Sequence, residues 1–241
     1  MDYLTVWLIS AAVLLAGCWL QSAAGFGMAV VAAPVIVLIK PEWVPYVLVI
    51  TALPLCLINM WNQRSGLKPK AMVVPMITRL PGTVIGAWIL VHINMFWLQI
   101  AVSVSVLLAV LFSVRSVHFE ATPGRLGLAG FVGGFMGTTT SIGGPPMALV
   151  MQHGNPLTVR ANLSFYFAFS VTISILSYAV AGILTWEVVL VSLSFLPCAM
   201  LGFALGVRSR AYVDGGRFRF ILLIICSLAA VVALTGALAG L

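Results

Sequence analysis

The residues whose types and spacing most clearly suggest a binding site lie in the stretch TTTSIGGPP at 138–146, inside an otherwise apolar run. Because glycine and proline destabilise a helix interior by roughly 1 and 3 kcal/mol each, this stretch predicts a helix break near 141–146. A helix that begins after the break offers free backbone N–H groups at the positive end of its dipole, and the neighbouring hydroxyls offer further donors. Such a group of donors predicts an anion site. Its candidate residues are Thr139, Thr140, Ser141, Gly143, Gly144 and Pro145.

A milder version of the same pattern lies 116 residues earlier, in QSAAGFGMAVVAAP at 21–34. Gly27 falls on Gly143 when the two stretches are aligned at this shift. Two helix tips that meet near the middle of a membrane from opposite faces would enclose a narrow site. The alternative is that glycine and small hydroxyl residues here only allow helices to pack closely. The candidate residues of the earlier stretch are Gln21, Gly25, Phe26 and Gly27.

Arg79 predicts the charge of the ligand. It follows Lys70 by nine residues, which places it roughly 13 Å into the membrane if the segment is helical. No Asp or Glu shares its apolar segment, and an arginine at such depth is costly and usually functional. The alternative is that its guanidinium reaches the interface or bonds to backbone carbonyls. We expect Arg79 to bind an anion.

Acidic residues are absent from the centres of the apolar segments. A site for sodium or a metal cation is therefore not expected, and no buried carboxylate is available to carry protons. We also expect no catalytic residues, no enzymatic activity and no cofactor. The acidic residues that lie at segment ends are Asp2, Glu42, Glu120, Glu187 and Asp214.

The composition places these candidate residues in a membrane. Of the 241 residues, 62% are hydrophobic and only 7% are charged, and the mean hydropathy is +1.17. Soluble domains do not have such a composition. The chain length therefore limits how many membrane segments, of roughly 20 apolar residues each, the protein can contain. We predict an all-α polytopic membrane protein with eight apolar segments, at 4–39, 43–61, 71–91, 95–114, 126–151, 161–182, 188–207 and 218–240.

The net charge of +7 does not indicate nucleic-acid binding, because the basic residues lie mainly in short loops, where they orient the chain. The four cysteines lie within apolar segments without CxxC spacing, so neither disulfides nor a zinc site is predicted. The first residues lack the basic start of a secretory signal, so we expect the first segment to remain in the mature protein. The expected partners are a small anion and the lipid bilayer, and two copies of the chain could form a homodimer.

The sequence divides into two similar halves. A shift of 116 residues aligns several glycines and prolines without a gap. The clearest match is Leu-Pro followed by a glycine, found at 80–86 and again at 196–202, and it predicts the same local helix break in both halves. We therefore predict one integral membrane domain made of two four-segment repeats, at 1–117 and 118–241.

The charges indicate that the two repeats are inverted. The loop after segment two is basic and the loop after segment three has no Lys or Arg, whereas the corresponding loops of the second half show the reverse. Equivalent loops then lie on opposite faces of the membrane. The basic loops all lie in the cytoplasm if segment five is re-entrant and segment one, its equivalent in the first half, re-enters from the other face. Segment one could also hold a full span plus a half-length piece. This topology places both termini outside and ten of the twelve Lys and Arg residues in the cytoplasm.

The two motifs resemble those of the TauE/SafE sulfite exporter family. GFG at 25–27, followed by Pro34, and SIGGPP at 141–146 each open one half of the chain, and the likeness covers essentially its whole length. Met28-Ala29 departs from the family pattern, which often has further glycines there. The resemblance implies an anion transporter of the 4-toluene sulfonate uptake permease-like superfamily. It also implies binding residues at Gly25, Phe26, Gly27, Ser141, Gly143, Gly144, Pro145 and Pro146.

The residues and the resemblance favour a transporter in the bacterial inner membrane that carries sulfite or an organosulfonate such as sulfoacetate by alternating access. A thiosulfate or sulfur-relay importer that uses Cys18 is one alternative. An intramembrane hydrolase with Ser141 and His153 is another, although no GxSxG or HExxH motif is present. A purely structural membrane subunit is the third, and it gives no reason for Arg79 at depth.

A topology measurement tests the re-entrant segment. Single cysteines introduced at 154–160 should react with an impermeant thiol reagent from the cytoplasmic face, because segment five enters and leaves there. Cysteines placed at 92–94, in a loop without Lys or Arg, should react from outside and provide the control. Reaction of 154–160 from outside would mean that segment five crosses the membrane once.

Overall fold

The computed structural model describes residues 2–24, 27–114, 120–213 and 216–239, and the regular structure in these ranges is entirely helical, as predicted. Two short 3-10 helices lie in connections, η1 (Pro41–Trp43) and η2 (Arg64–Gly66). The α-helices are α1 (Tyr3–Ala24), α2 (Met28–Ile39), α3 (Tyr46–Asn62), α4 (Pro69–His92), α5 (Met95–Val114), α6 (Pro123–Thr140), α7 (Gly144–Met151), α8 (Pro156–Val180), α9 (Trp186–Ser194), α10 (Leu196–Val213) and α11 (Gly216–Leu238).

The starts of several helices are set by the local sequence. α4, α6 and α8 each begin with a proline, whose missing N–H would have no partner in the first turn. Asn155 precedes α8 and its side chain accepts hydrogen bonds from the N–H groups of Leu157 and Thr158. Such a cap typically stabilises a helix by about 1 kcal/mol.

Segments one and five are broken, as predicted. Segment one contains α1 and α2, and segment five contains α6 and α7, which are separated at 141–143. Ser141 ends α6 in the left-handed conformation with φ of 67°, and its N–H bonds to the carbonyl of Gly137. Pro145 and Pro146 lie in the first turn of α7, where proline is tolerated, so the break precedes them.

The break predicted at Leu80-Pro81 is wrong for the first half. α4 continues as one helix through Pro75 and Pro81. The corresponding segment of the second half is divided at Phe195 into α9 and α10, which are bent by 41°. Proline removes one intrahelical hydrogen bond, but α4 lies against α6, and a membrane helix supported by its neighbours tolerates that loss. The same dipeptide therefore has different consequences in the two halves.

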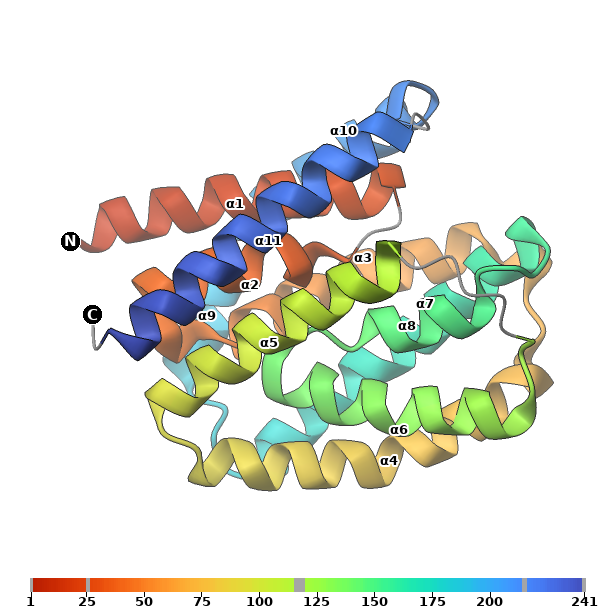
Figure 1. Cartoon of the computed structure of the whole chain (residues 1–241), viewed down its shortest axis with the longest axis horizontal. Coiled ribbons are helices and arrows are strands. Elements are labelled where there is room, and N and C mark those ends of the chain that lie inside the picture. The colour runs from red at the N-terminus through yellow and green to blue at the C-terminus, as the bar shows by residue number, and fades with distance from the viewer. Residues whose placement is uncertain (1, 25–26, 115–119, 214–215, 240–241) are drawn as a thin grey trace.

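Two pairs of parallel helices form the frame of the molecule. α4 packs on α6 and α1 packs on α10, and Figure 1 shows the two pairs running in opposite directions. Glycine makes the first contact possible: a Cβ added at Gly82 or Gly86 of α4 would meet the backbone carbonyl of Phe131 or Phe135 on α6. Small residues at such positions allow the backbones of membrane helices to touch.

The second pair repeats this packing with a shift of one helical turn. A Cβ added at Gly202 of α10 would meet the carbonyl of Leu15 on α1, and Leu15 aligns with Phe131 at the shift of 116. Gly202 is therefore the packing equivalent of Gly82, although the gapless shift aligns it with Gly86. The additional turn lies in α9 and α10, which together are longer than α4.

The remaining helices attach to these two pairs. α8 packs on α4, α3 packs on α9, and α3 and α8 pack against each other between the pairs. α5 and α11 lie together; α11 contacts the short helix α2, and α5 contacts both α2 and α7. The two broken segments and the α3–α8 contact therefore meet in the interior of the bundle.

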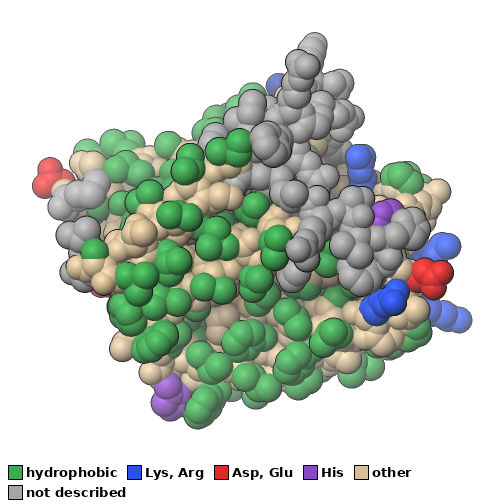
Figure 2. Space-filling model, viewed as in Figure 1, with side chains coloured by type: hydrophobic (Ala, Val, Ile, Leu, Met, Phe, Trp, Pro, Cys, Tyr) green, Lys and Arg blue, Asp and Glu red, His purple; other side chains and the backbone are tan. Residues whose placement is uncertain are grey.

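The exterior is that of a multi-pass membrane protein. Hydrophobic side chains are spread across the described part of the face in Figure 2, and charged side chains lie at its edges. Among the described residues, α1, α4 and α8 are long and apolar enough to cross a membrane, and α9–α10 adds a fourth if the bent pair is one span. Lys and Arg side chains gather towards one end of the bundle (Figure 2). We call this the basic end, and its described residues are Arg64, Lys68, Lys70, Arg125, Arg160 and Arg208.

Gly82→Ala should lower the melting temperature of the protein purified in detergent. The new Cβ would overlap the carbonyl of Phe131, and overpacking of this kind costs typically about 1–3 kcal/mol. Gly124→Ala, in the first turn of α6, is the matched control, because a Cβ there meets nothing within 4 Å. Equal melting temperatures for both variants and the wild type would contradict the direct backbone contact between α4 and α6.

Candidate functional site

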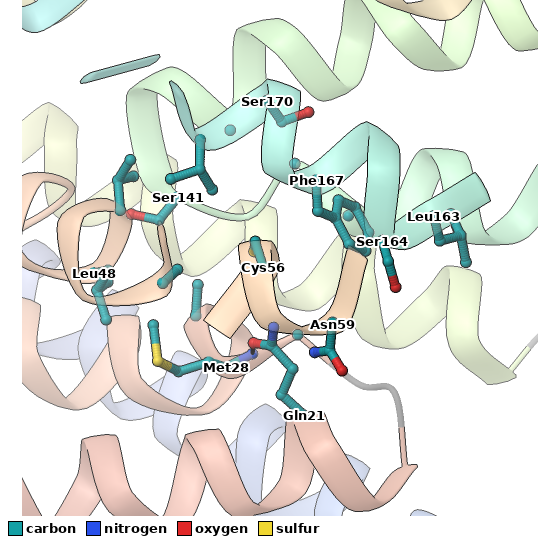
Figure 3. Close-up of a pocket in the computed structure, with 18 of the residues that line it drawn as sticks. Gln21, Met28, Leu48, Cys56, Asn59, Ser141, Leu163, Ser164, Phe167 and Ser170 are labelled. Atoms are coloured by element: carbon teal, nitrogen blue, oxygen red, sulfur yellow. Dashed lines mark hydrogen bonds between the residues drawn. The ribbon is translucent and has the colours of Figure 1, made fainter. Parts of the chain in front are cut away.

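A cavity of about 210 Å³ lies where the two broken segments meet. Gly27 and Met28 line it from the first break, and Ser141, Gly143 and Gly144 line it from the second. Figure 3 shows residues of both halves around the same space, with Gln21 and Met28 on one side and Ser141 and Phe167 on the other. Residues more than 100 positions apart in the sequence therefore form one site.

Helices α3 and α8 provide the two long walls. The lining residues of each helix recur every three or four positions, which places them on one face. Residues of this face on α3 are Leu48, Val49, Ala52, Cys56 and Asn59, and Gln63 follows directly after the helix. Those on α8 are Arg160, Leu163, Ser164, Phe167, Ser170, Val171 and Ser174.

Arg79 reaches the cavity from α4 and is almost completely buried, with 2% of its surface exposed. Its Nη1 donates to the carbonyl of Gly133 at 2.9 Å and lies 3.4 Å from the hydroxyl of Tyr166. Its Nη2 donates to the carbonyl of Ser170 and to the hydroxyl of Ser174, both at 3.1 Å. The remaining donor, Nε, has no hydrogen-bond partner among the described residues. Snorkelling is therefore excluded, whereas bonding to backbone carbonyls, the other alternative, is observed.

Two glycines of α6 leave room for Arg79. A Cβ added at Gly137 would lie 3.2 Å from Nη2 of Arg79, and one added at Gly134 would lie 2.5 Å from its backbone carbonyl oxygen. Any larger residue at these positions would displace the guanidinium or separate α4 from α6. The glycines of α6 are thus required by the position of the charge as well as by the helix contact.

The charge of Arg79 has no counter-charge in the described part of the chain. All four of its hydrogen-bond partners are neutral, and no Asp or Glu lines the cavity. The ion pair found among the described residues joins Lys40 and Glu42 at 2.6 Å, outside the cavity. No cluster of three or more His, Cys, Asp or Glu residues occurs in the described ranges. The site is therefore cationic and suits an anion.

The second break contributes backbone donors to this site. Gly144 is the first residue of α7, and its N–H belongs to the first turn, which has no intrahelical acceptors. Pro145 and Pro146 have no N–H, so the tip of α7 offers fewer donors than its sequence position suggested. The hydroxyl of Ser141 donates to the carbonyl of Pro45 at 3.1 Å and anchors the break against α3. The N–H of Gly144, rather than the Ser141 hydroxyl, is the donor that this break offers to a ligand.

At the first break, a side chain of the preceding helix accepts a backbone N–H at the start of α2. The Oε1 atom of Gln21 accepts a hydrogen bond of 2.8 Å from the N–H of Met28 at the start of α2. Because Oε1 is engaged there, the amide NH₂ group of Gln21 is the end that remains available, and Gln21 lines the cavity. This side chain therefore adds donors rather than acceptors to the site.

The comparison with known protein families agrees with this geometry. The model for "Sulfite exporter TauE/SafE" matches residues 9–233, which is nearly the whole chain. The chain belongs to the TauE/SafE sulfite exporter family. No curated protein and no solved structure matches it. The membership identifies a membrane transporter, and it confirms the resemblance of the two motifs.

The structure brings together six of the residues predicted from the motifs and from Arg79. Thr139 and Thr140 do not line the cavity, because their hydroxyls donate to the carbonyls of Phe135 and Met136 in their own helix. Pro145 does not line it either, and Gly25 and Phe26 lie outside the described residues. The residues that do line the cavity are Gln21, Gly27, Arg79, Ser141, Gly143 and Gly144.

Sequence reasoning missed most of the α8 wall of this family member. Ser170 and Ser174 hold Arg79, and Arg160 and Phe167 line the cavity. The signal that could have found them is the spacing of Arg160, Ser164, Phe167, Ser170 and Ser174, which recur every three or four residues and so share one face of α8. Asn162, by contrast, faces Lys68, whose N–H it accepts at 2.9 Å, and it acts as a helix contact.

The alternatives gain no support from the geometry. Cys18 is fully buried outside the cavity lining, and its Sγ lies 3.1 Å from the Sδ of Met28. The Ser141 hydroxyl bonds to a backbone carbonyl, and His153 is exposed in the connection between α7 and α8. Neither a sulfur relay through Cys18 nor a Ser141–His153 pair is formed.

Cys56 allows the cavity to be tested directly. A small hydrophilic methanethiosulfonate reagent should modify Cys56, which lines the cavity, and leave Cys18 unmodified, as read by mass spectrometry of the intact protein and its peptides. Sulfoacetate should slow the modification if it occupies the same space. Cys56→Ser should remove the signal, and preferential modification of Cys18 would contradict the cavity described above.

Proposed function

We propose that this family member transports a small sulfur-containing oxyanion, such as sulfite or an organosulfonate like sulfoacetate, across the bacterial inner membrane. The observation that carries the proposal is the buried guanidinium of Arg79, which lines the cavity at both helix breaks without a described counter-charge. A bound anion would supply that counter-charge. The family membership supports the same class of substrate.

The energetics favour an anion over a neutral ligand. Burying a charge costs several kcal/mol even after relaxation, and its polar contacts recover only part of that. An oxyanion about 4 Å from the guanidinium would regain about 4 kcal/mol at an effective dielectric constant of 20. The site therefore binds anions more tightly than neutral molecules of the same size.

The polar groups around the cavity supply donors that match the oxygens of a sulfite or sulfonate group. The Nε of Arg79 and the hydroxyl of Ser170 are both buried without a partner among the described residues. The amide NH₂ of Gln21 and the N–H of Gly144 add two more donors. We assign the oxyanion to this group of four donors, at the α6–α7 tip and beside Gln21.

The proposed mechanism is alternating access between two inverted repeats. It is supported by the opposite directions of the α1–α10 and α4–α6 pairs, each of which takes one helix from each repeat. Because α3 packs on α9 and α8 packs on α4, the moving units would be α1, α3, α9 and α10 on one side and α4, α6 and α8 on the other. The cavity lies between these units, against α3 and α8.

The orientation we propose places the basic end in the cytoplasm and both termini outside. Figure 1 shows both termini at the end opposite the basic end. α6 begins and α7 ends at the basic end, whereas α1 begins and α2 ends at the opposite end, which supports two hairpins entering from opposite faces. Since α1 is also long enough to cross the membrane, the first hairpin consists of a full-length helix and a half-length one.

Arg79→Gln should lower anion flux by about one to two orders of magnitude while the protein remains folded. Removing a charged hydrogen-bond donor costs about 1.5–3 kcal/mol, or roughly 10- to 100-fold in rate. The measurement is flux of labelled sulfite and sulfoacetate into liposomes that contain the purified protein, with empty liposomes as the blank. Lys70→Gln, which removes an exposed positive charge outside the cavity, is the matched control and should retain full flux.

Each outcome of this experiment is informative. Flux that persists at the wild-type rate in a correctly inserted Arg79→Gln protein would contradict the role of Arg79. Absence of flux of both anions in the wild-type protein would contradict the substrate class. Flux lost equally in the Lys70→Gln control would indicate a general effect of charge rather than a binding site.

A further inference from the structure

We propose that Arg160 is an outer oxyanion-binding residue at the mouth of the same cavity. It captures the anion from the aqueous side before the anion reaches Arg79. This inference rests on the proposed function, because it assigns a second binding position on the path of the transported anion. Arg160 lines the cavity and is exposed, whereas Arg79 lines it and is buried.

One face of α8 connects the two cations. From Arg160 towards the C-terminus, the polar residues on this face are Ser164, Ser170 and Ser174. Their exposed fractions fall from 9% to 5% and 1%. The cavity therefore leads from the exposed guanidinium of Arg160 into the interior, where Arg79 bonds to Ser170 and Ser174.

The two cations are too far apart to hold one small anion together. Arg160 precedes Ser170 by ten residues, which is about 15 Å along the helix axis. Side chains on a helix lean towards its N-terminus, so the Arg160 guanidinium points away from the level of Ser170. A sulfite or sulfonate group would therefore bind first near Arg160 and then near Arg79.

Arg160 is distinguished from the other cations of the basic end. The guanidinium of Arg64 stacks over the ring of Trp61 at 4.3 Å, and Arg125 donates to the carbonyl of Glu120. Neither of these arginines lines the cavity, and nor do Lys68 and Lys70. Arg160 forms no ion pair with a described residue, so its charge is available to an anion at the mouth.

Beyond the other end of the cavity, aromatic rings of α3 and α8 are in contact. The rings of Tyr46 on α3 and Tyr178 on α8 lie 5.2 Å apart, and the Tyr178 hydroxyl donates to the carbonyl of Thr138 at 2.6 Å. None of these three residues lines the cavity. An anion can therefore enter from the Arg160 side, and this makes Arg160 the first cation that it meets.

An exposed cation at a cavity mouth acts mainly on capture. It raises the local concentration of the anion and its association rate, and salt screens the effect because the charge is exposed. A residue of this kind lowers KM for anions presented on its own side. It leaves the maximal rate unchanged, because that rate depends on the steps after capture.

Arg160→Gln should raise KM for sulfoacetate presented on the basic-end side by about 3- to 10-fold, within the range known for electrostatic steering. The maximal rate should stay within about twofold, and the dependence of the rate at low substrate on ionic strength should weaken. The protein is reconstituted in liposomes of neutral phosphatidylcholine, and rates are measured at several salt concentrations. Lys70→Gln is again the control for the loss of one positive charge at this end.

Charge restoration separates capture from a structural role. Arg160→Lys should keep a KM close to that of the wild type. In a Cys56→Ser background, Arg160→Cys modified with a trimethylammonium methanethiosulfonate should recover a low KM, whereas modification with a sulfonate-bearing reagent should raise KM further. A structural role would not follow the sign of the attached charge.

Two results would overturn the inference while leaving the proposed function intact. An unchanged KM and salt dependence in Arg160→Gln, with flux still lost in Arg79→Gln, would exclude an outer site. An effect of Arg160→Gln that appears only when anionic phosphatidylglycerol is present would mean that Arg160 binds lipid phosphate instead. If the wild-type protein carries no anion at all, the proposed function itself fails.

Discussion

The buried charge of Arg79 constrains the helices around it. Taking a guanidinium out of water is costly, so its N–H groups need acceptors and the helices that supply them must lie close. α6 supplies the carbonyl of Gly133, and α8 supplies Ser170 and Ser174. Gly137 is a glycine because the guanidinium occupies the space beside it. Arg79 therefore joins α4, α6 and α8, and its Nε has no hydrogen-bond partner among the described residues.

The two repeats share their packing but not this chemistry. By the packing of the glycines, Arg79 on α4 corresponds to Ala199 on α10. On the facing helices, Gly137 of α6 corresponds to Gln21 of α1, whose Oε1 accepts the N–H of Met28. The first tip is thus satisfied by an amide of the chain itself, whereas the second tip faces a cation. Among the described residues, the two halves therefore enclose one cavity in which the second tip lies beside a cation and the first beside an amide.

The sequence predicted the features that depend on local chemistry. The depth of Arg79 follows from a charge within an apolar run, and the break at 141–143 follows from glycine next to proline. The course of α4 through Pro81 depends on α6 and could not be predicted from its own residues. Thr139 and Thr140 have the right chemical type, but in a helix such hydroxyls often bond to a carbonyl three or four residues earlier. The serines of α8 share one helix face, but serine is also common at ordinary helix contacts, so their bonds to Arg79 depend on how α8 packs on α4.

The distribution of hydrogen bonds decides which contacts can open. α6 and α8 are joined by the bond from Tyr178 to Thr138, and Arg79 joins both to α4. Separating them would leave buried polar groups unpaired at about 1–3 kcal/mol each. No hydrogen bond joins α3 to α8 within the described residues, whereas Thr51 of α3 donates to the carbonyl of Ser192 on α9. The contact that opens with the least loss of hydrogen bonds is therefore the one between α3 and α8, where the cavity lies. Under the alternating access proposed above, Arg79 would keep its four hydrogen bonds.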